Sequence, residues 1–70
     1  MSLDSIKTGE KRTIRKVGGR SKTRNFLGSL GFVEGGDVTV ITELGGNMIV
    51  NVKGSRVALS KEIAAHIVIY

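Results

Sequence analysis

The clearest apolar pattern in the chain predicts a short helix that ends at a glycine. Phe26, Leu27 and Leu30 stand one, three and four positions apart, so they share one face of a helix. Gly31 follows the last apolar position, where a left-handed C-cap favours glycine because glycine has no Cβ to clash. Phe32 falls where such a cap places its hydrophobic contact with the last turn. We therefore expect one short helix, with both phenylalanines used in the core.

Short hydroxyl side chains mark the starts of the helical segments. Ser21 or Thr23 is expected to cap the helix, because a hydroxyl oxygen can accept a hydrogen bond from an otherwise unpaired helical N–H. Ser60 is expected to cap a single helical turn near the end of the chain. Leu3 and Ile6 stand three positions apart and predict another helical turn, which would lie under the sheet.

The rest of the chain alternates apolar and polar positions in the manner of short β-strands. The alternation changes phase twice: Ile14 and Val17 are three positions apart, and Ile41 and Leu44 do not continue the phase of the residues before them. We expect a β-bulge or a bend at each of these points. The predicted strands cover residues 11–17, 37–44, 48–52, 56–59 and 66–70.

Pairs of residues that contain glycine separate the predicted strands. Gly35-Gly36 predicts a turn before the second strand, and Gly45-Gly46 and Gly54-Ser55 predict two hairpin turns. Five to six short strands, one helix after the first strand and a helical turn before the last describe a mostly β protein, a small SH3-like barrel. Closing the sheet hides its edges, which suits a chain too small to cover a flat sheet. The predicted core contains Leu27, Leu30, Phe32, Val40, Val50, Val52, Leu59 and Ile67.

Length and composition restrict the class of protein. A chain of 70 residues is expected to form one domain, residues 1–70, with a marginal core, since such chains bury only about 60% of their unfolded surface. The absence of cysteine excludes disulfides and thiolate metal sites. No apolar run approaches the roughly 20 residues of a membrane span, and no signal peptide is recognisable. We expect a soluble, cytoplasmic protein.

The net charge of +5 is unevenly distributed. Asp4 and Glu10 are the only acids in the first third of the chain. This imbalance indicates an anionic partner, such as nucleic acid, a membrane surface or an acidic protein, or else a solvated strand face that keeps a small protein soluble. The basic residues of this third are Lys7, Lys11, Arg12, Arg15, Lys16, Arg20, Lys22 and Arg24.

The residues that could carry catalysis are few and scattered. His66 is the only histidine and is expected on the outward face of the last strand, with no second base or ligand in sight. Among the acids, only Glu34 and Asp37 stand close together, and a hard cation needs several more oxygen ligands than these two supply. We therefore expect no enzyme, no catalytic residue, no metal site and no cofactor.

Two kinds of binding module can be compared with the sequence. A domain that grips proline-rich peptides needs an aromatic-lined groove, but this chain has two phenylalanines, one tyrosine and no tryptophan. A nucleic-acid module would place stacking aromatics among its basic residues, and none lie there. Non-specific binding to a nucleic-acid backbone stays open, because phosphate contacts need only lysine and arginine.

Four segments of the chain together resemble one protein family. The segment Leu27-x-x-Leu30-Gly31-Phe32-x-x-Gly35, with Arg24 upstream, resembles the central motif of the ferrous iron transport protein A (FeoA) family. The family's opening, middle and ending are similar to Leu3-x-x-Ile6-x-x-Gly9, to Gly45-Gly46 followed by Val50-x-Val52-x-Gly54, and to Ala58-Leu59 followed by Ala64-x-x-Ile67-x-Ile69. Two positions depart from the pattern: Glu34 replaces a frequent proline, and Phe26 replaces a frequent basic residue.

The resemblance implies an SH3-like barrel that serves as a cytoplasmic accessory of bacterial ferrous iron uptake. The implied protein partner is the membrane permease FeoB, on the side of its cytoplasmic G-domain. A similar barrel forms the C-terminal domain of DtxR-like repressors, but the chain resembles the stand-alone accessory more closely. For docking we expect Arg20, Lys22 and Arg24, around the helix entrance, to meet an acidic or lipid-headgroup surface. A monomer or a weak homo-oligomer is expected.

Two alternatives to this function remain open at the level of sequence. The first is a small basic nucleic-acid-binding barrel, whose binding would weaken steeply as salt rises. The second is a GTPase-activating role in which Arg20 or Arg24 stabilises charge in trans, as an arginine finger does. An arginine finger has no sequence signature of its own, so spacing does not support it.

Overall fold

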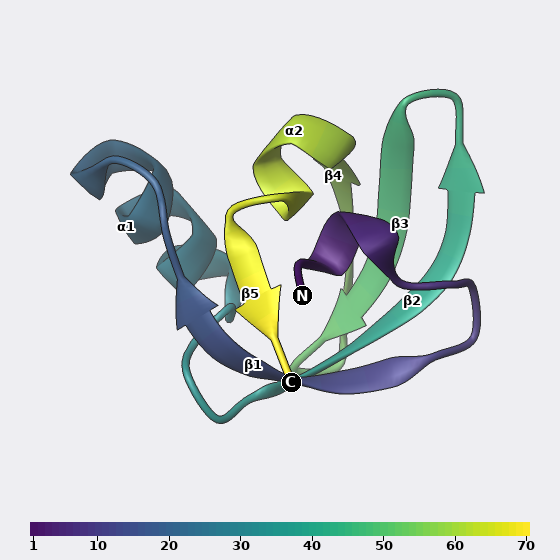
Figure 1. Ribbon diagram of the computed structural model, residues 1–70, viewed down its shortest axis with the longest axis horizontal. Coiled ribbons are helices and arrows are strands. Elements are labelled where there is room, and N and C mark those ends of the chain that lie inside the picture. Colours follow the sequence, from purple (N-terminus) through teal and green to yellow (C-terminus); the bar gives the residue numbers. More distant parts are fainter.

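The computed structural model describes all residues, 1–70, as one curled β-sheet with three short helical segments (Figure 1). The longest helix, α1, follows the first strand, and the shortest strand, β5, ends the chain. In chain order the elements are the 3-10 helix η1 (Leu3–Ser5), β1 (Lys11–Val17), α1 (Ser21–Leu30), β2 (Asp37–Leu44), β3 (Asn47–Val52), β4 (Ser55–Ser60), α2 (Lys61–Ala64) and β5 (Ile67–Ile69).

The sheet has the strand order β4-β3-β2-β1-β5, and all neighbouring strands are antiparallel. Both predicted irregularities are present: the register shifts between Ile14 and Lys16 where β1 pairs with β5, and between Val40 and Thr42 where β2 pairs with β3. A bulge bends a strand and increases its twist, so these two positions let a short sheet curl around one core. The predicted mostly β architecture is confirmed.

β1 takes part in both halves of the curled sheet. Its first residues pair with β2, and its second half pairs with β5. At the change of partner, the N–H of Ile14 donates to the carbonyl of Gly36 (2.8 Å), and the carbonyl of Ile14 accepts from the N–H of Gly35 (2.8 Å). Ile14 also stands opposite Ile69 of β5 and is fully buried. The predicted glycine turn therefore also joins the two halves.

The core consists only of apolar side chains. On β3, Met48, Val50 and Val52 are buried and alternate with more exposed residues, as predicted. Leu30 was expected in the core, but it is only half-buried and packs against the core from the edge. The buried residues are Leu3, Ile6, Ile14, Leu27, Phe32, Val38, Val40, Met48, Val50, Val52, Leu59, Ala64, Ile67 and Ile69.

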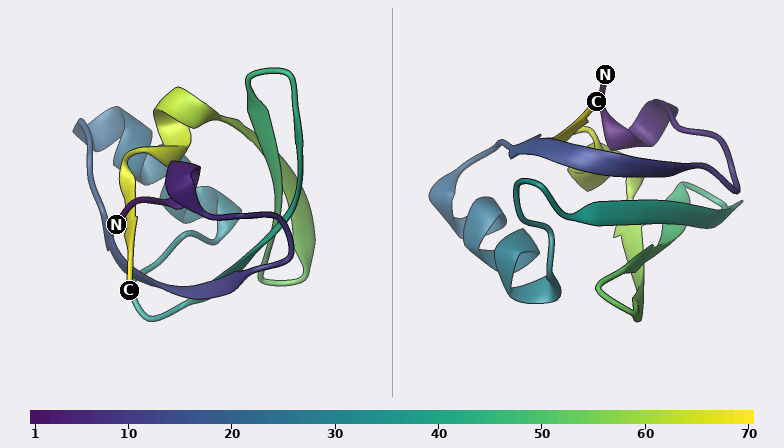
Figure 2. Two further views of the ribbon diagram at one scale, coloured as in Figure 1. Left: turned by 45° about the vertical axis from the view of Figure 1, so that its right-hand side comes forward. Right: turned by 90° about the horizontal axis from the view of Figure 1, so that it is seen from below.

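Helix α1 lies outside the curled sheet (Figure 2) and buries a single side chain, Leu27. The expectation that Phe26 belongs to the core is wrong: its side chain is 52% exposed. Adjacent helical residues point about 100° apart, so a helix with a narrow buried face cannot bury both. The predicted C-cap is confirmed, since Gly31 is left-handed (φ 107°) and the N–H of buried Phe32 donates to the carbonyl of Leu27 (3.0 Å).

The two predicted helix caps have different outcomes. The prediction for α1 is wrong, because the N-cap is Arg20 and no side chain caps this end. Ser21 is already the first helical residue, and its hydroxyl accepts from Arg24 Nη2 (3.1 Å) instead. The prediction for α2 is confirmed: Ser60 Oγ accepts from the backbone N–H of Ile63 (3.2 Å).

The second hairpin turn lies one residue earlier than predicted. Its two central residues are Lys53 (φ 49°) and Gly54 (φ 77°), not Gly54 and Ser55, because Ser55 already pairs with Val52. Two-residue hairpin turns of the type I′ kind need positive φ at both central positions, since their twist then matches that of the strands. Lys53 is the only residue other than glycine with a positive φ, which is why the sequence pattern misplaced the turn.

The segment before β1 covers the outer edge of β5. The predicted helical turn is observed as η1; its first residue, Leu3, and its C-cap, Ile6, are both buried. Ser2 forms an isolated bridge with Val68, and the N–H of Ile69 donates to the carbonyl of Met1 (2.9 Å). One edge of the sheet is therefore paired with the chain's own first residues.

Leu27→Ala is expected to lower the free energy of unfolding by about 2–5 kcal/mol, because Leu27 is the one fully buried side chain of α1. Leu30→Ala should cost less, about 1 kcal/mol, since Leu30 is only half-buried. Urea unfolding followed by circular dichroism measures both. Equal losses for the two variants would contradict the assignment of Leu27 as the anchor of α1.

Gly31→Ala is expected to destabilise the protein by about 1–2 kcal/mol, because alanine is strained at φ 107°. An added Cβ would also approach the Lys53 side chain to 3.2 Å. Gly28→Ala is the matched control, since it lies inside α1 with nothing within 4 Å of an added Cβ. It should stabilise by about 0.5–1 kcal/mol. Thermal melts with the same sign for both variants would refute this reading of the C-cap.

Candidate protein-docking surface

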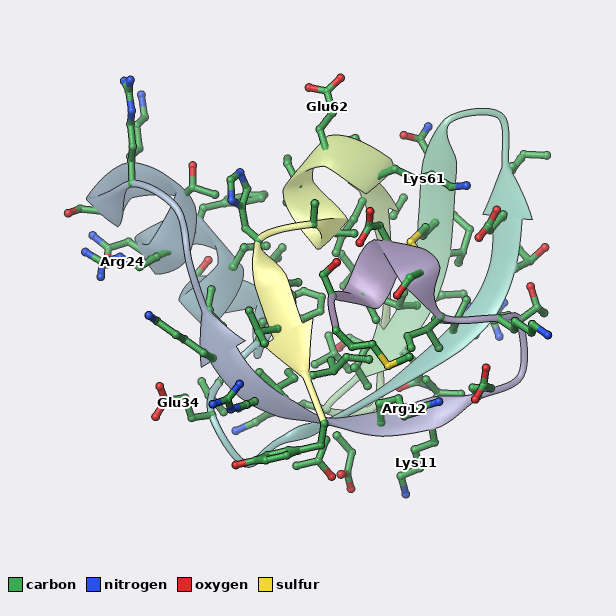
Figure 3. The ribbon with its side chains drawn as sticks, viewed as in Figure 1. Lys11, Arg12, Arg24, Glu34, Lys61 and Glu62 are labelled. Carbon is green, nitrogen blue, oxygen red and sulfur yellow. The ribbon has the colours of Figure 1, made fainter.

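The three basic residues predicted for docking all lie at the start of α1 and are all exposed. Arg20 is the N-cap, and Lys22 and Arg24 belong to the first turns. Helix α1 stands outside the sheet at the end of β1, and Figure 3 shows Arg24 projecting outward from it. A partner therefore has direct access to this end of the helix.

The three residues do not form one cluster. Arg24 is helical, but Arg20 is the N-cap and has an extended backbone (φ −71°, ψ 158°), so helical spacing does not place the Arg20 side chain on either flank of α1. The N–H of Arg24 donates to the carbonyl of Arg20 (2.9 Å), which closes the first turn. Lys22 stands two positions before Arg24 and so lies on the opposite flank of the helix, which it shares with the exposed Phe26. The structure thus places all three predicted residues at the start of α1, with Lys22 and Arg24 on opposite flanks of the helix.

Two further basic residues, Arg15 and Lys16, are exposed on β1 just before α1. In a regular strand, one of two consecutive residues would point to the core. The bulge between Ile14 and Lys16 removes that alternation, so both cations face solvent. The spacing of Ile14 and Val17 signals this pair in the sequence, because it leaves two consecutive positions outside the core.

We call Arg15, Lys16, Arg20, Lys22 and Arg24 the basic surface; none of them is neutralised by a carboxylate within 4.0 Å. The first turn of α1 contains no acidic residue either. The positive end of the helix dipole therefore coincides with these cations. The ion pairs of the chain lie elsewhere and are Lys11–Asp37 (3.6 Å), Arg12–Glu10 (2.9 Å) and Lys61–Glu43 (3.0 Å).

The carboxylates near β1 are held away from the basic surface by their own partners. Arg12 Nη2 donates to Glu10 and lowers the pKa of that carboxyl, with a second contribution from the backbone N–H of Lys7. Asp37 pairs with Lys11 and also accepts from the hydroxyl of Thr13 (3.2 Å). Glu10 and Asp37 therefore already have cationic partners at the end of β1 that lies away from α1.

The remaining candidates for chemistry are dispersed over the structure. His66 is exposed, and its ring lies beside Gly19, where an added Cβ would come within 3.4 Å of the ring carbon Cγ. Glu34 is exposed and pairs with no cation, and Asp37 is already paired, so the two acids singled out in the sequence do not act together. No three side chains among histidine, aspartate and glutamate are grouped as metal ligands. None of the helices has the length and apolarity needed to cross a bilayer.

Comparison with solved structures places the fold among known proteins. The FeoA protein from Chlorobium tepidum is 26% identical; the match covers 100% of this chain and 69% of that one with a TM-score of 0.90. FeoA from Stenotrophomonas maltophilia, solved in complex with zinc and described as a prokaryotic SH3 domain protein, is 24% identical, with 100% and 89% covered and a TM-score of 0.89. The predicted SH3-like fold is confirmed.

The same fold occurs as part of larger proteins. A manganese-dependent transcriptional repressor in complex with manganese is 18% identical; the match covers 100% of this chain but 35% of the repressor, with a TM-score of 0.92. At this identity the likeness concerns the fold alone. A search of curated proteins gives no match.

The family comparison covers the whole sequence. The family model of the FeoA domain matches residues 1–70, the same span over which four segments resemble the family's pattern. Glu34 and Phe26, the two departures from that pattern, are exposed and leave the sheet and the C-cap of α1 intact. The chain belongs to the FeoA domain family.

Proposed function

We propose that this protein is a non-enzymatic accessory of bacterial ferrous iron uptake that docks, in the cytoplasm, on the G-domain side of the permease FeoB. Membership of the FeoA domain family supports the link to iron transport. The S. maltophilia relative is itself described as a candidate ferrous iron transport activating factor. The observation that carries the docking proposal is the exposed, unneutralised basic surface on β1 and α1.

The charge distribution supports an acidic protein partner. Lys and Arg number 11, and three of them are in ion pairs, so eight basic side chains have no carboxylate within 4.0 Å. Five of these eight form the basic surface. Exposed charges of one sign attract an oppositely charged partner and orient it during the encounter. In the complex that forms, such charged contacts contribute more to specificity than to affinity.

The exposed Phe26 adds an apolar contact to one flank of this surface. Its side chain is 52% exposed and shares its flank with Lys22. Aromatic residues are enriched where proteins bind one another, since they offer a large apolar area at low conformational cost. An exposed aromatic side chain beside basic residues suits a protein surface of mixed character, and it also suits single-stranded nucleic acid, whose bases stack on aromatic rings. We therefore place the α1 flank of Lys22 and Phe26 inside the proposed interface.

Titration of the isolated FeoB G-domain against this protein tests the proposal. Saturable binding is expected, and Arg24→Glu should weaken it by about tenfold, because reversing a charge next to an acidic partner costs about 1.4 kcal/mol or more. Lys7→Glu is the matched control: it makes the same change of charge at an exposed position before β1, outside the basic surface. It should alter the dissociation constant by less than about threefold.

Salt and nucleic acid distinguish the proposal from its alternative. Binding through a mixed basic and aromatic surface should weaken modestly between low and high salt, and Phe26→Ser should weaken it at both. A duplex DNA and a single-stranded RNA run beside the G-domain serve as controls. Binding to nucleic acid alone, with affinity falling steeply as salt rises, would reject the transporter accessory. Equal effects of Arg24→Glu and Lys7→Glu would reject the proposed surface.

A further inference from the structure

The outer edge of β4 carries backbone groups that nothing in the chain pairs. β4 is the last strand of the sheet, and its only neighbour is β3. In antiparallel strands, hydrogen-bonded pairs alternate with pairs that are not bonded. The N–H of Lys61 donates to the carbonyl of Gly46 (3.1 Å), and the pairing continues in register down to the two-residue turn. Ser55, Val57 and Leu59 therefore bond to β3.

The alternate residues of β4 point their N–H and C=O groups away from the sheet. These are Arg56, Ala58 and Ser60. Arg56 and Ala58 take part in no backbone hydrogen bond outside the regular elements, whereas Ser60 is also the N-cap of α2, whose first turn uses its carbonyl. We call this row of groups the open edge. Arg56 and Ala58 are exposed, and Ser60 is half-buried. The open edge is thus available at Arg56 and Ala58 and at the N–H of Ser60.

The opposite edge of the sheet is treated differently. There Met1 and Ser2 pair with β5 through the Ile69 N–H and the bridge to Val68. The first two residues of the chain thus pair with the β5 edge of the sheet, whereas the β4 edge stays unpaired. Exposed edges usually carry protection, such as a bulge, a proline, a central charge or a cover, because unpaired strands otherwise recruit further strands.

β4 lacks most of these forms of protection. Its register with β3 is unbroken over six residue pairs, while the β1–β5 and β2–β3 pairings both contain a bulge. The chain contains no proline. The only charge on β4 is Arg56, close to its first residue. The open edge is therefore a regular template for one more strand.

The side chains around the open edge indicate what that strand contains. Arg56 and Lys53, in the turn just before it, are both exposed, and neither has a carboxylate within 4.0 Å. Ala58 lies two positions after Arg56 on the same face of the sheet. It is exposed and stands opposite half-buried Ile49 of β3. The face is thus basic at one end and small and apolar next to it. The net charge of +5 opposes pairing with a second copy and favours an acidic segment.

We propose that the open edge of β4 binds an extended acidic segment of a partner protein, which adds to the sheet as a sixth strand. Main-chain hydrogen bonds to Arg56 and Ala58 supply affinity, and the alternate side chains supply selectivity. Whether the added strand runs parallel or antiparallel to β4, its acidic residue lies opposite Arg56. Two positions along the added strand, on the same face, a small or β-branched residue lies opposite Ala58. This surface differs from the basic surface, so the proposal holds or fails independently of docking on FeoB.

The test uses a synthetic six-residue peptide, Thr-Glu-Thr-Val-Thr-Glu, capped at both ends and added to ¹⁵N-labelled protein. One of its faces carries glutamate, valine and glutamate, so in either strand direction a glutamate lies opposite Arg56 when the valine lies opposite Ala58. The largest amide shifts are expected at Arg56, Ala58 and Ser60, since their N–H groups gain partners. The same peptide with lysine in place of glutamate should bind at least tenfold more weakly. The original peptide with N-methylated amides should also bind at least tenfold more weakly, because it cannot donate main-chain hydrogen bonds to β4.

Ala58→Pro is the decisive variant. It removes one outward N–H but no hydrogen bond to β3, and edge positions of this kind tolerate proline. Binding of the acidic peptide should fall at least tenfold. Ala58→Ser, which keeps the N–H, should bind as the parent does. Circular dichroism of both variants shows whether the sheet is retained, and the N-methylated peptide tests the same hydrogen bonds if Ala58→Pro does not fold.

Three results would overturn the proposal. Shifts confined to α1, or no shifts at millimolar peptide, would mean that the open edge does not recruit an acidic strand. A dimer in sedimentation experiments that Ala58→Pro dissociates would show that a second copy occupies the edge instead.

In the free monomer, the amides of Arg56 and Ala58 should exchange with solvent at least tenfold faster than those of Val57 and Leu59.

Discussion

The backbone of Ile14 holds the two halves of this small sheet together. Its N–H and C=O bond to the glycine turn before β2, while its side chain lies in the core opposite Ile69. Directly after it, the bulge turns β1 toward β5. A chain of 70 residues without cysteine has few other means of closing a sheet. The same bulge exposes Arg15 and Lys16, so one irregularity both closes the core and extends the basic surface.

Much of this fold follows from local patterns, and the exceptions have physical reasons. The spacing of Ile14 and Val17 predicted the bulge, and Gly31 predicted the left-handed cap, because each signal lies within a few residues. The exposure of Phe26 could not be predicted, since helical spacing does not tell whether Phe26 or its neighbour Leu27 faces the sheet. The turn at Lys53 was also missed, because a lysine with positive φ leaves no trace in the apolar pattern.

The candidate site was predictable in composition but not in geometry. The uneven charge of the sequence identified Arg20, Lys22 and Arg24, and helix geometry then placed Lys22 and Arg24 on opposite flanks. Which cations remain unneutralised depends on contacts between distant segments, such as Lys61 with Glu43. The open edge of β4 depends on the complete strand order, which no single segment reveals. The protein thus has two different exposed surfaces: basic side chains on β1 and α1, and unpaired backbone groups on β4.

The pairing of β1 with β5 has a consequence for how the protein folds. The hairpins β2–β3 and β3–β4 join neighbouring segments, whereas Ile14 meets Ile69 across almost the whole sequence. Bringing such distant segments together costs loop entropy before any contact is gained, and topologies with distant contacts fold slowly. We expect the three-stranded meander to form early and the β1–β5 seam to close last. Until that seam closes, Ile67 and Ile69 stay exposed to water, and the chain depends on rapid closure to avoid association with other unfinished chains.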